Sequence, residues 1–381
     1  MTVDPGRFSA SAWSLEHPAV DALMAKIRRV GVPLVDFAGV KPYYGIKTGL
    51  NEAFLLDEAT KEELIRQDPK CSKIIKSCLR GQDIERWYSS GKYWLITFPS
   101  SLNYQWSWSQ AGGEEAEFIF SLKYPSIYKH LYKYKQQLIK RQDKGLYWWE
   151  LRSCQYYQAF EELKIVHTDI TWSPKFSLAN QGTYLLNTGY LWSTKDFYLL
   201  AIVNSPLNWS YMWRNAAHGK DEALRLIYSF IETLPIAPPP SESHRKETEE
   251  HVSQLIELTR TNQETQRDLI DWLRIETNLE KSSRKLQDPT SLDLEDFKKE
   301  IKKCAAKGTT FGLKKYREIA EVYNEAIPQL RQNNTKIRQL EHRLSDLVNQ
   351  AYQLTPDEIA LLWKTAPPRM PIDPPDTLTS P

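Results

Sequence analysis

Cysteine, glycine and long apolar runs are all scarce in this sequence of 381 residues. Its four cysteines are too few and too scattered for a disulfide framework, and none forms the Cys-x-x-Cys pair typical of zinc sites. No apolar run approaches the roughly 18–20 residues that a membrane helix needs. The first residues also lack the apolar stretch of a signal peptide. These absences favour a cytoplasmic protein with no membrane partner.

The usual signatures of catalysis are missing as well. The 15 glycines form neither a P-loop nor a dinucleotide-binding turn, and the seven histidines have no metal-binding spacing. No G-x-S-x-G nucleophile elbow occurs. Glu162-Leu-Lys164 has the E-x-K form of a nuclease core but no convincing upstream Pro-Asp partner, so a strand entry with a flanking ion pair is the competing interpretation. The sequence therefore predicts no catalytic residue and no metal site, and leaves enzymatic activity open.

Aromatic side chains are abundant and unevenly distributed. Of the 45 Trp, Tyr and Phe residues, 38 lie before residue 241. The segment Leu234–Pro240 ends this aromatic part, because its three consecutive prolines cannot continue a helix or a central strand. A long polar sequence with helical periodicity follows. The net charge of +2 therefore averages over two parts of different composition.

Apolar periodicity predicts an α+β part followed by an all-α part. The short strands are expected at 92–98, 164–168 and 183–187. Helices are expected in the first part at 124–141 and 196–213, and in the second at 241–286, 292–306, 312–327, 331–352 and 355–364. The helix at 331–352 carries a nearly coiled-coil stripe, and Thr355–Glu358 reads as a capping box.

Four regions follow from these patterns. They are a connecting helix or linker at 1–39, a mixed α+β domain at 40–240, a helical and partly coiled-coil-like domain at 241–364, and a disordered proline-rich tail at 365–381.

Basic residues gather among aromatic ones between Lys123 and Arg152. Eight Lys or Arg oppose only Asp143 and Glu150 there, a local net charge of +6. Basic side chains neutralise phosphates, and planar aromatic rings can stack on bases. The competing interpretation is a core-facing helical stripe with its lysines in solvent, and composition alone leaves both open.

Seven stretches occur in the order found in one known family. They are Tyr44–Phe54, Leu79–Arg86, Tyr124–Leu131, Arg141–Arg152, Phe160–Val166, Leu200–Leu207 and Phe230–Ile236. Together they resemble the TaqI-type target-recognition domain of class γ adenine-N6 DNA methyltransferases and Type IIG restriction-modification enzymes. The resemblance covers about residues 40–240, with a weaker match at Asp346–Ile359. It implies sequence-specific recognition of double-stranded DNA.

The catalytic half of that family does not match this sequence. Its glycine-rich cofactor motif and its Asn-Pro-Pro-Tyr/Phe motif are both absent, and Phe8–Asp36 resembles only the connecting helix. The resemblance thus implies a recognition module that positions DNA for adenine methylation by a catalytic domain or subunit outside this chain. S-adenosylmethionine is expected on that half, and no cofactor on this chain. The alternative is a stand-alone enzyme, either a nuclease using Glu162 and Lys164 or a degenerate DNA methyltransferase.

Nine residues are candidates for contacts with DNA. They are Lys47, Arg80, Asn103, Gln105, Arg141, Lys144, Trp148, Trp149 and Arg152. Gly45 and Gly49 are expected to let the backbone approach a phosphate, and Asn103 and Gln105 lie in a polar loop suited to base contacts. Glu150 is expected to pair with Arg152 or Arg141, and Arg86 with Asp83 or Glu85. For each candidate, a core or solvated role is the competing interpretation.

Overall fold

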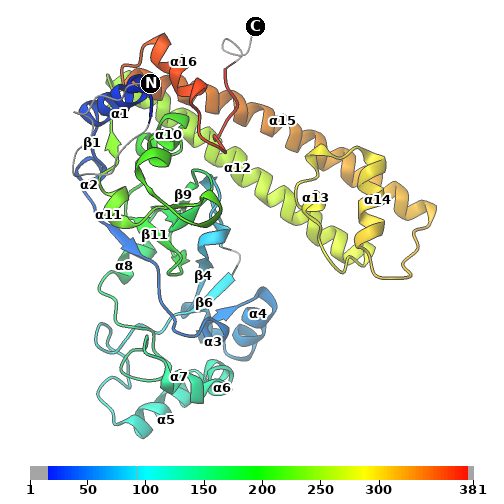
Figure 1. Cartoon of the computed structure of the whole chain (residues 1–381). Coiled ribbons are helices and arrows are strands. Elements are labelled where there is room, and N and C mark those ends of the chain that lie inside the picture. The colour runs from blue at the N-terminus through cyan, green and yellow to red at the C-terminus, as the bar shows by residue number, and fades with distance from the viewer. Residues whose placement is uncertain (1–15, 92, 376–381) are drawn as a thin grey trace. The chain divides into compact units, whose positions relative to one another are not determined.

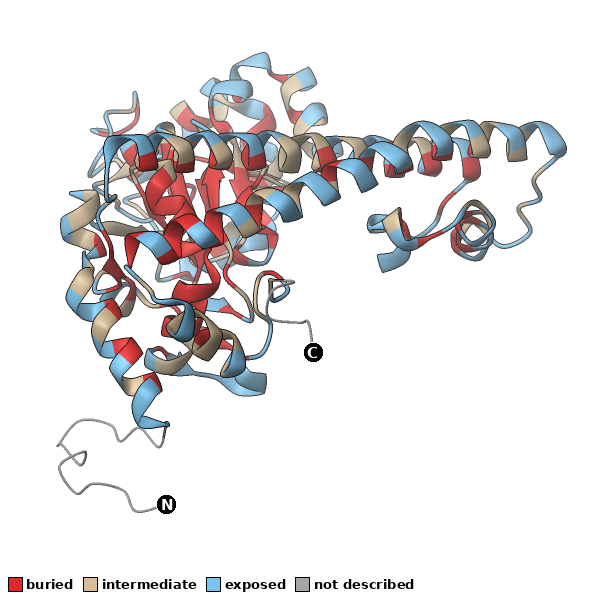
Figure 2. Cartoon of the chain, turned by 90° about the horizontal axis from the view of Figure 1, so that it is seen from above, coloured by how far each residue is buried: buried red, intermediate tan, exposed pale blue. Residues whose placement is uncertain are grey.

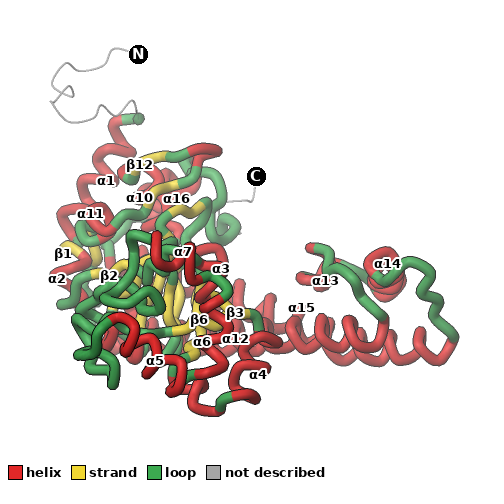
Figure 3. The backbone as a smooth tube through the Cα atoms, turned by 90° about the horizontal axis from the view of Figure 1, so that it is seen from below, coloured by secondary structure: helices red, strands yellow, loops and turns green. Residues whose placement is uncertain are grey.

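The computed structural model describes residues 16–91 and 93–375, and the chain divides into two units (Figure 1). The first unit consists of Met1–Lys246 and Leu347–Pro381, and the second of Glu247–Asp346. The first unit mixes helices with small sheets. The described second unit consists of helices and loops, apart from one β-bridge between Leu279 and Ala305 (Figure 3). The predicted α+β part followed by a helical part is confirmed.

A five-stranded sheet of the first unit has the order β2-β11-β7-β9-β5. Its strands are β2 Pro42–Tyr44, β5 Trp87–Tyr88, β7 Lys164–Thr168, β9 Phe176–Ala179 and β11 Gly189–Trp192. Every residue of β7, β9 and β11 is buried, which explains why these segments do not alternate between apolar and polar residues. The strand predicted at 164–168 is confirmed.

A four-stranded sheet has the order β10-β4-β6-β3. Its strands are β3 Leu55–Leu56, β4 Ile75–Leu79, β6 Tyr93–Ile96 and β10 Tyr184–Leu185, so the strands predicted at 92–98 and 183–187 are present with shorter bounds. Two smaller sheets complete the unit. They pair β1 Val32–Pro33 with β14 Pro235–Ile236, and β13 Leu224–Arg225 with both β12 Ala217–His218 and β8 Ile170–Thr171.

Short helices surround these sheets. They are α1 Pro18–Val30, α2 Leu34–Ala38, α3 Asn51–Phe54, α4 Glu58–Gln67, α5 Gly113–Lys123, α6 Pro125–Tyr132, α7 Lys135–Lys140, α8 Tyr157–Glu161, α9 Phe197–Val203, α10 Pro206–Asn215, α11 Tyr228–Ile231 and α16 Pro356–Lys364. The helix predicted at 124–141 is divided between α6 and α7, and the one at 196–213 between α9 and α10. The capping box of α16 is confirmed, because Thr355 and Glu358 bond to each other's backbone N–H.

The second unit is built on an antiparallel pair of long helices. α12 Glu242–Thr277 lies beside α15 Leu313–Ala351, since Arg343 pairs with Glu247 at one end and Lys315 with Glu276 at the other. The connection holds α13 Arg284–Gln287 and α14 Leu294–Cys304. Buried residues line the inner faces of the pair (Figure 2).

Two helices predicted at 312–327 and 331–352 form the single helix α15, with Pro328 inside it. A proline costs an interior helix a hydrogen bond and a steric clash. Here the flanking Ile327 and Leu330 are fully buried in the core of the second unit, and this packing offsets the cost.

The proline-rich segment after α16 contacts the first unit as far as the structure describes it. Trp209 donates its Nε1–H to the carbonyl oxygen of Pro368 at 3.0 Å, Arg214 donates to that of Thr365 at 2.7 Å, and Ile372 is buried. The predicted disorder therefore does not apply to residues 365–375, and residues 376–381 lie outside the described part. Prolines lack backbone donors but keep carbonyl acceptors, and side chains of the first unit use those acceptors.

His167 in β7 provides a test of the packing in this core. Its ring is fully buried, stacks on Tyr190 with a centroid distance of 5.3 Å, and contacts Phe176. Burial lowers the pKa of His167 from 6.5 to about 4. An unfolded histidine takes up a proton near pH 6.5, whereas the folded one does so only near pH 4, so stability from this group is complete above pH 6.5 and is lost as pH falls.

We expect this single group to remove roughly 3 kcal/mol of unfolding free energy between pH 6.5 and pH 4. Urea unfolding of wild type and His167→Gln between pH 6.5 and pH 4 measures this loss of unfolding free energy. His167→Phe is a second variant that keeps a ring at this position but cannot take up a proton. The variants should lose less stability on acidification than wild type does. An equal loss in all three proteins would contradict the assignment.

Candidate nucleic-acid interface

Three loops of the first unit are joined by hydrogen bonds into one surface, called here the three-loop surface. The loops are residues 45–50, 100–110 and 141–154. Arg141 donates to the carbonyl oxygen of Thr48, which joins the third loop to the first. Glu150 accepts from the backbone N–H of Ser101 at 3.0 Å, and the Asn103 side chain accepts from that of Cys154 at 3.0 Å. Segments nearly a hundred residues apart in sequence therefore lie side by side.

Arg141 acts as an internal clamp of these loops. Its guanidinium donates to the carbonyl oxygens of Thr48, Trp148 and Glu150 and lies 4.6 Å from the ring centroid of Phe54. Burial lowers the pKa of Arg141 to about 10, even though Asp143 and Glu150 act in the opposite direction. Because its side chain is buried and bonded internally, Arg141 is not available to DNA as the sequence predicted.

Glu150 is the second clamp, and it is fully buried. Its carboxyl oxygens accept from the indole N–H of Trp108 at 3.0 Å and from the backbone N–H groups of Ser101 and Leu146. The predicted ion pair with Arg152 or Arg141 is wrong, since Arg152 pairs with Asp143 and Arg141 meets only the Glu150 carbonyl. Backbone N–H groups, the Trp108 indole and the Ser101 hydroxyl satisfy this carboxyl group instead.

The two tryptophans predicted to face DNA belong to the core. Trp149 is stacked between Phe120, at 4.8 Å, and Tyr147, at 4.9 Å. Trp148 is also buried and donates its indole N–H to Glu117 at 3.1 Å. For these rings the core interpretation is confirmed. Aromatic side chains stabilise this domain through area and ring geometry.

Arg80 has an internal partner, although it was predicted to face DNA. It forms a two-point ion pair with Asp83, at 2.8 and 3.0 Å, and lies 3.9 Å from the ring centroid of Tyr93. Arg86 donates to the carbonyl oxygen of Asn204 at 2.9 Å. The one-turn helix Gly81–Asp83 brings the carboxyl group back onto Arg80, which therefore has a structural partner.

The remaining five candidates lie on the three-loop surface with at least part of their side chains accessible. Asn103, Gln105, Lys144 and Arg152 are exposed, and Lys47 is half-buried. Lys144 donates to the carbonyl oxygen of Ile139, and the Oδ1 of Asn103 is occupied by Ser153 and Cys154. Among the described residues, the side chains of Lys47 and Gln105 form no hydrogen bond or ion pair. The structure thus brings together two classes of side chain, cations and amides.

The two glycines of the first loop have packing roles. A side chain at Gly45 would place its Cβ 2.0 Å from the carbonyl oxygen of Leu186. Gly49 has a left-handed backbone, with φ of 70°, and lies against Asp143. What closely approaches Gly45 is therefore protein backbone, not the predicted phosphate.

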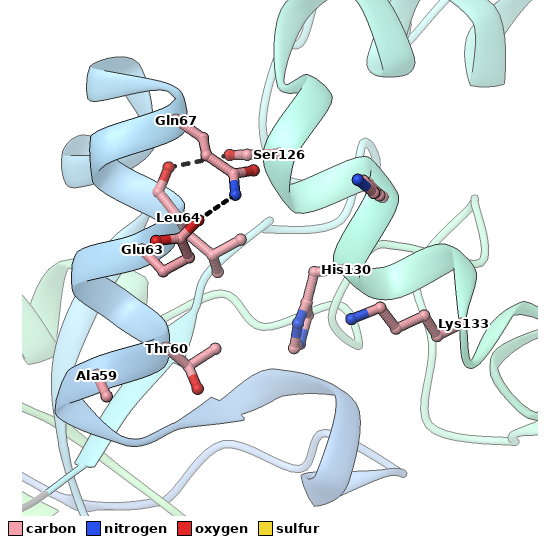
Figure 4. A pocket seen from close by; sticks show the side chains of 9 residues that line it. Ala59, Thr60, Glu63, Leu64, Gln67, Ser126, His130 and Lys133 are labelled. Carbon is pink, nitrogen blue, oxygen red and sulfur yellow. Dashed lines mark hydrogen bonds between the residues drawn. The ribbon is translucent and has the colours of Figure 1, made fainter.

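A polar cleft lies between α4 and α6 (Figure 4). Its volume is about 400 Å³, and its α6 wall carries Lys129, His130 and Lys133. His130 contacts the carbonyl oxygen of Ala53 at 3.0 Å, and burial lowers its pKa. Glu63 lies on the opposite wall and bonds to Gln67. The sequence analysis did not identify this cleft. Its walls come from α4 and α6, and strands β4 and β6 lie between these two helices in the sequence.

Glu162 and Lys164 do not form a nuclease-like pair. Lys164 is fully buried and donates its ammonium protons to the carbonyl oxygens of Glu162, at 2.6 Å, and Asn180, at 2.9 Å. Burial lowers the pKa of Lys164 to about 8. The Glu162 side chain is exposed. Lys164 therefore completes backbone hydrogen bonding at the start of β7.

Residues 16–91 and 93–375 contain no group of three or more His, Cys, Asp or Glu side chains placed to hold a metal ion. No helix in the same described ranges is long and apolar enough to span a membrane.

The fold defined by these elements is similar to part of a known restriction-modification enzyme, and a second such enzyme gives a weaker match. One is the Type IIL restriction-modification enzyme MmeI, solved in complex with DNA, with a TM-score of 0.50 and 12% sequence identity over 86% of this chain and 35% of that chain. Another is the Type IIG restriction endonuclease BpuSI, with a TM-score of 0.38 and 15% identity over 89% of this chain and 33% of that one. This chain thus spans about a third of the length of either enzyme.

Comparisons of the sequence give one match, to a family without a described function. Residues 241–348 match a family described as a domain of unknown function, DUF8810. No curated protein matches the sequence.

Proposed function

We propose that the chain is a sequence-specific DNA-recognition module of the TaqI-like kind, belonging to an adenine-specific DNA methyltransferase or Type IIG restriction-modification system. The observation that carries this proposal is the three-loop surface, which presents cations and amides from a fold similar to that of DNA-bound MmeI. The module would position double-stranded DNA for methylation by a catalytic domain or subunit outside this chain. S-adenosylmethionine would bind to that partner.

The three-loop surface has the two kinds of group that recognition requires. Lys47, Lys144 and Arg152 supply positive charge for phosphates, which gives affinity and fixes orientation. The amide groups of Asn103 and Gln105 can donate and accept hydrogen bonds at base edges. The buried clamps Arg141 and Glu150 hold these side chains on a preformed backbone, and a preformed surface loses little entropy on binding.

The alternative function is a stand-alone enzyme, a nuclease or a degenerate methyltransferase. Its strongest candidate pair, Glu162 and Lys164, receives no support from the geometry, because the Lys164 ammonium is already bonded to two carbonyl oxygens. DNA recognition is therefore the function that the site supports best.

Selection from duplexes with a randomised central segment tests the proposal. The purified chain is expected to enrich one short sequence, and the enriched sequence defines the selected duplex. Incubation of that duplex with the chain and S-adenosylmethionine, or with Mg²⁺, is expected to give neither methylation nor cleavage. Enrichment of no sequence would contradict recognition, and either product would favour the alternative.

A further inference from the structure

Exposed cations gather at the end of the second unit where α12 finishes and α15 begins. We call this set the hairpin-end cluster: Lys281, Arg284, Lys285, Lys302 and Lys307. Within the described part of the chain, none of these five side chains forms an ion pair or a hydrogen bond. Each therefore keeps its hydrogen-bond donors available to solvent.

Backbone hydrogen bonds bring three members of the cluster together, and α13, which carries Arg284 and Lys285, packs against α14. Leu279 pairs with Ala305 in an antiparallel bridge, and Glu280 N–H donates to the Cys304 carbonyl oxygen at 3.1 Å. Ala306 N–H donates to the carbonyl oxygen of Asn278 at 2.9 Å. These bonds place Lys281 beside the C-terminal end of α14, which carries Lys302 and leads to Lys307, although both lie more than twenty positions later in the sequence.

Charge is segregated along α14. In its first half, Lys298 pairs with Glu295 and Lys299 with Asp296, both at 2.9 Å, so that end is close to neutral. The second half ends in Lys302 and Lys303, which also suit the negative end of the helix dipole.

Three acidic residues lie near the cluster, and one of them, the exposed Asp288, follows α13 and donates its backbone N–H to the carbonyl oxygen of Arg284 at 3.1 Å. Glu300 is buried; its hydrogen bond from Ser283 is the largest cause that lowers its pKa, and Lys303 and Lys285 add to the effect. Glu280 is exposed. These three carboxyl groups are outnumbered by the five cluster cations and Lys303, so net positive charge remains at this surface.

We propose that the hairpin-end cluster binds the phosphate backbone of double-stranded nucleic acid without reading its sequence. This inference rests on the proposed function and adds to it a second contact surface in the other unit. All five members of the cluster are long cationic side chains. Such a composition neutralises phosphates and releases counterions, whereas base reading needs amide or fork contacts in a groove.

The test is duplex binding by the full chain as a function of salt. The cluster variant carries Lys281→Gln, Arg284→Gln, Lys302→Gln and Lys307→Gln. The matched control also removes four exposed or paired cations of the same unit: Lys298→Gln, Lys299→Gln, Lys336→Gln and Arg338→Gln. For a random-sequence duplex, the cluster variant should raise the Kd at least tenfold at about 0.1 M salt. It should also reduce the slope of log affinity against log salt by about 2 to 4, because each lost phosphate contact removes about 0.9. The control should bind like wild type, and thermal melts should show that both variants remain folded.

An unchanged slope in the cluster variant would overturn the inference and leave the proposed function standing, provided that the wild-type chain binds the duplex. If wild type bound no duplex at low salt, the proposed function and this inference would fail together. A variant that lost affinity for polyglutamate but not for the duplex would show that the cluster recognises an acidic protein, and this too would overturn the inference.

Discussion

Glu150→Ala is expected to lower the unfolding free energy of the first unit by roughly 3–5 kcal/mol. The substitution removes the acceptor of Trp108 Nε1–H and of the backbone N–H groups of Ser101 and Leu146. Leaving a buried donor unpaired costs about 1–3 kcal/mol, and the fully buried Trp108 should contribute most. Urea unfolding followed by tryptophan fluorescence measures the loss. The ring centroids of Trp108 and Trp149 lie 6.1 Å apart, so the signal reports on this part of the core.

Two further variants make this result specific. Glu150→Gln keeps one side-chain acceptor and should show an intermediate loss. Glu115→Ala removes an exposed glutamate from α5 and should change stability by less than about 0.5 kcal/mol. If Glu150→Ala matched this exposed control, Glu150 would not be the clamp of the three loops.

Neutralising Lys47, Lys144 and Arg152 together is expected to weaken duplex binding by about a hundredfold at low salt. The triple variant Lys47→Gln, Lys144→Gln, Arg152→Gln should also flatten the salt slope by roughly 2 to 3, because each lost phosphate contact removes about 0.9 from it. Fluorescence anisotropy with the selected duplex at several salt concentrations gives both quantities. All three side chains reach solvent, so stability should change little.

The matched control neutralises three exposed cations elsewhere in the first unit, Arg29→Gln, Lys195→Gln and Lys220→Gln. It should bind the duplex like wild type. If both triple variants lost the same affinity for the duplex, the effect would be one of net charge alone. If the Lys47, Lys144 and Arg152 variant lost no affinity, the three-loop surface would not be part of the interface.

Arg141→Ala should lower the stability of the fold. The basic composition of its segment had suggested a role for Arg141 in DNA binding instead. Its guanidinium joins Thr48 to Trp148 and Glu150, and removal would leave buried carbonyl oxygens without donors. Any loss of DNA binding by this variant would therefore reflect disrupted loops. The Lys47, Lys144 and Arg152 variant avoids this difficulty.

The sequence predicted the class of fold well because that class depends on local patterns. An apolar run identified β7, and the Thr355–Glu358 capping box marked the start of α16. Helical spacing identified α12, but the predicted helix extended to 286, whereas α12 ends at Thr277 and the separate helix α13 follows. Pro328 was misleading, since local propensity places a helix break there while the burial of Ile327 and Leu330 keeps α15 continuous. Tertiary packing overrides propensity where apolar residues on both sides of an unfavourable residue pack in the core.

The candidate surface was predictable only in part, because charge in a sequence does not reveal partners in space. Arg141 and Lys144 look alike in a basic segment, yet one is bonded to three internal carbonyl oxygens and the other is exposed. Arg80 was predicted to face DNA, yet the turn at Gly81–Asp83 brings the Asp83 carboxyl group back onto it. The joining of the three loops depends on contacts across nearly a hundred residues, which no local pattern contains.

The most direct test of the central claim is the Kd of the full wild-type chain for the selected duplex and for a scrambled duplex, between about 50 and 200 mM salt. We expect both complexes to weaken in parallel as salt rises, with the selected duplex bound at least about a thousandfold more tightly. Equal affinity for the two duplexes, or no binding at about 50 mM salt, would contradict the claim that this chain is a DNA-recognition module.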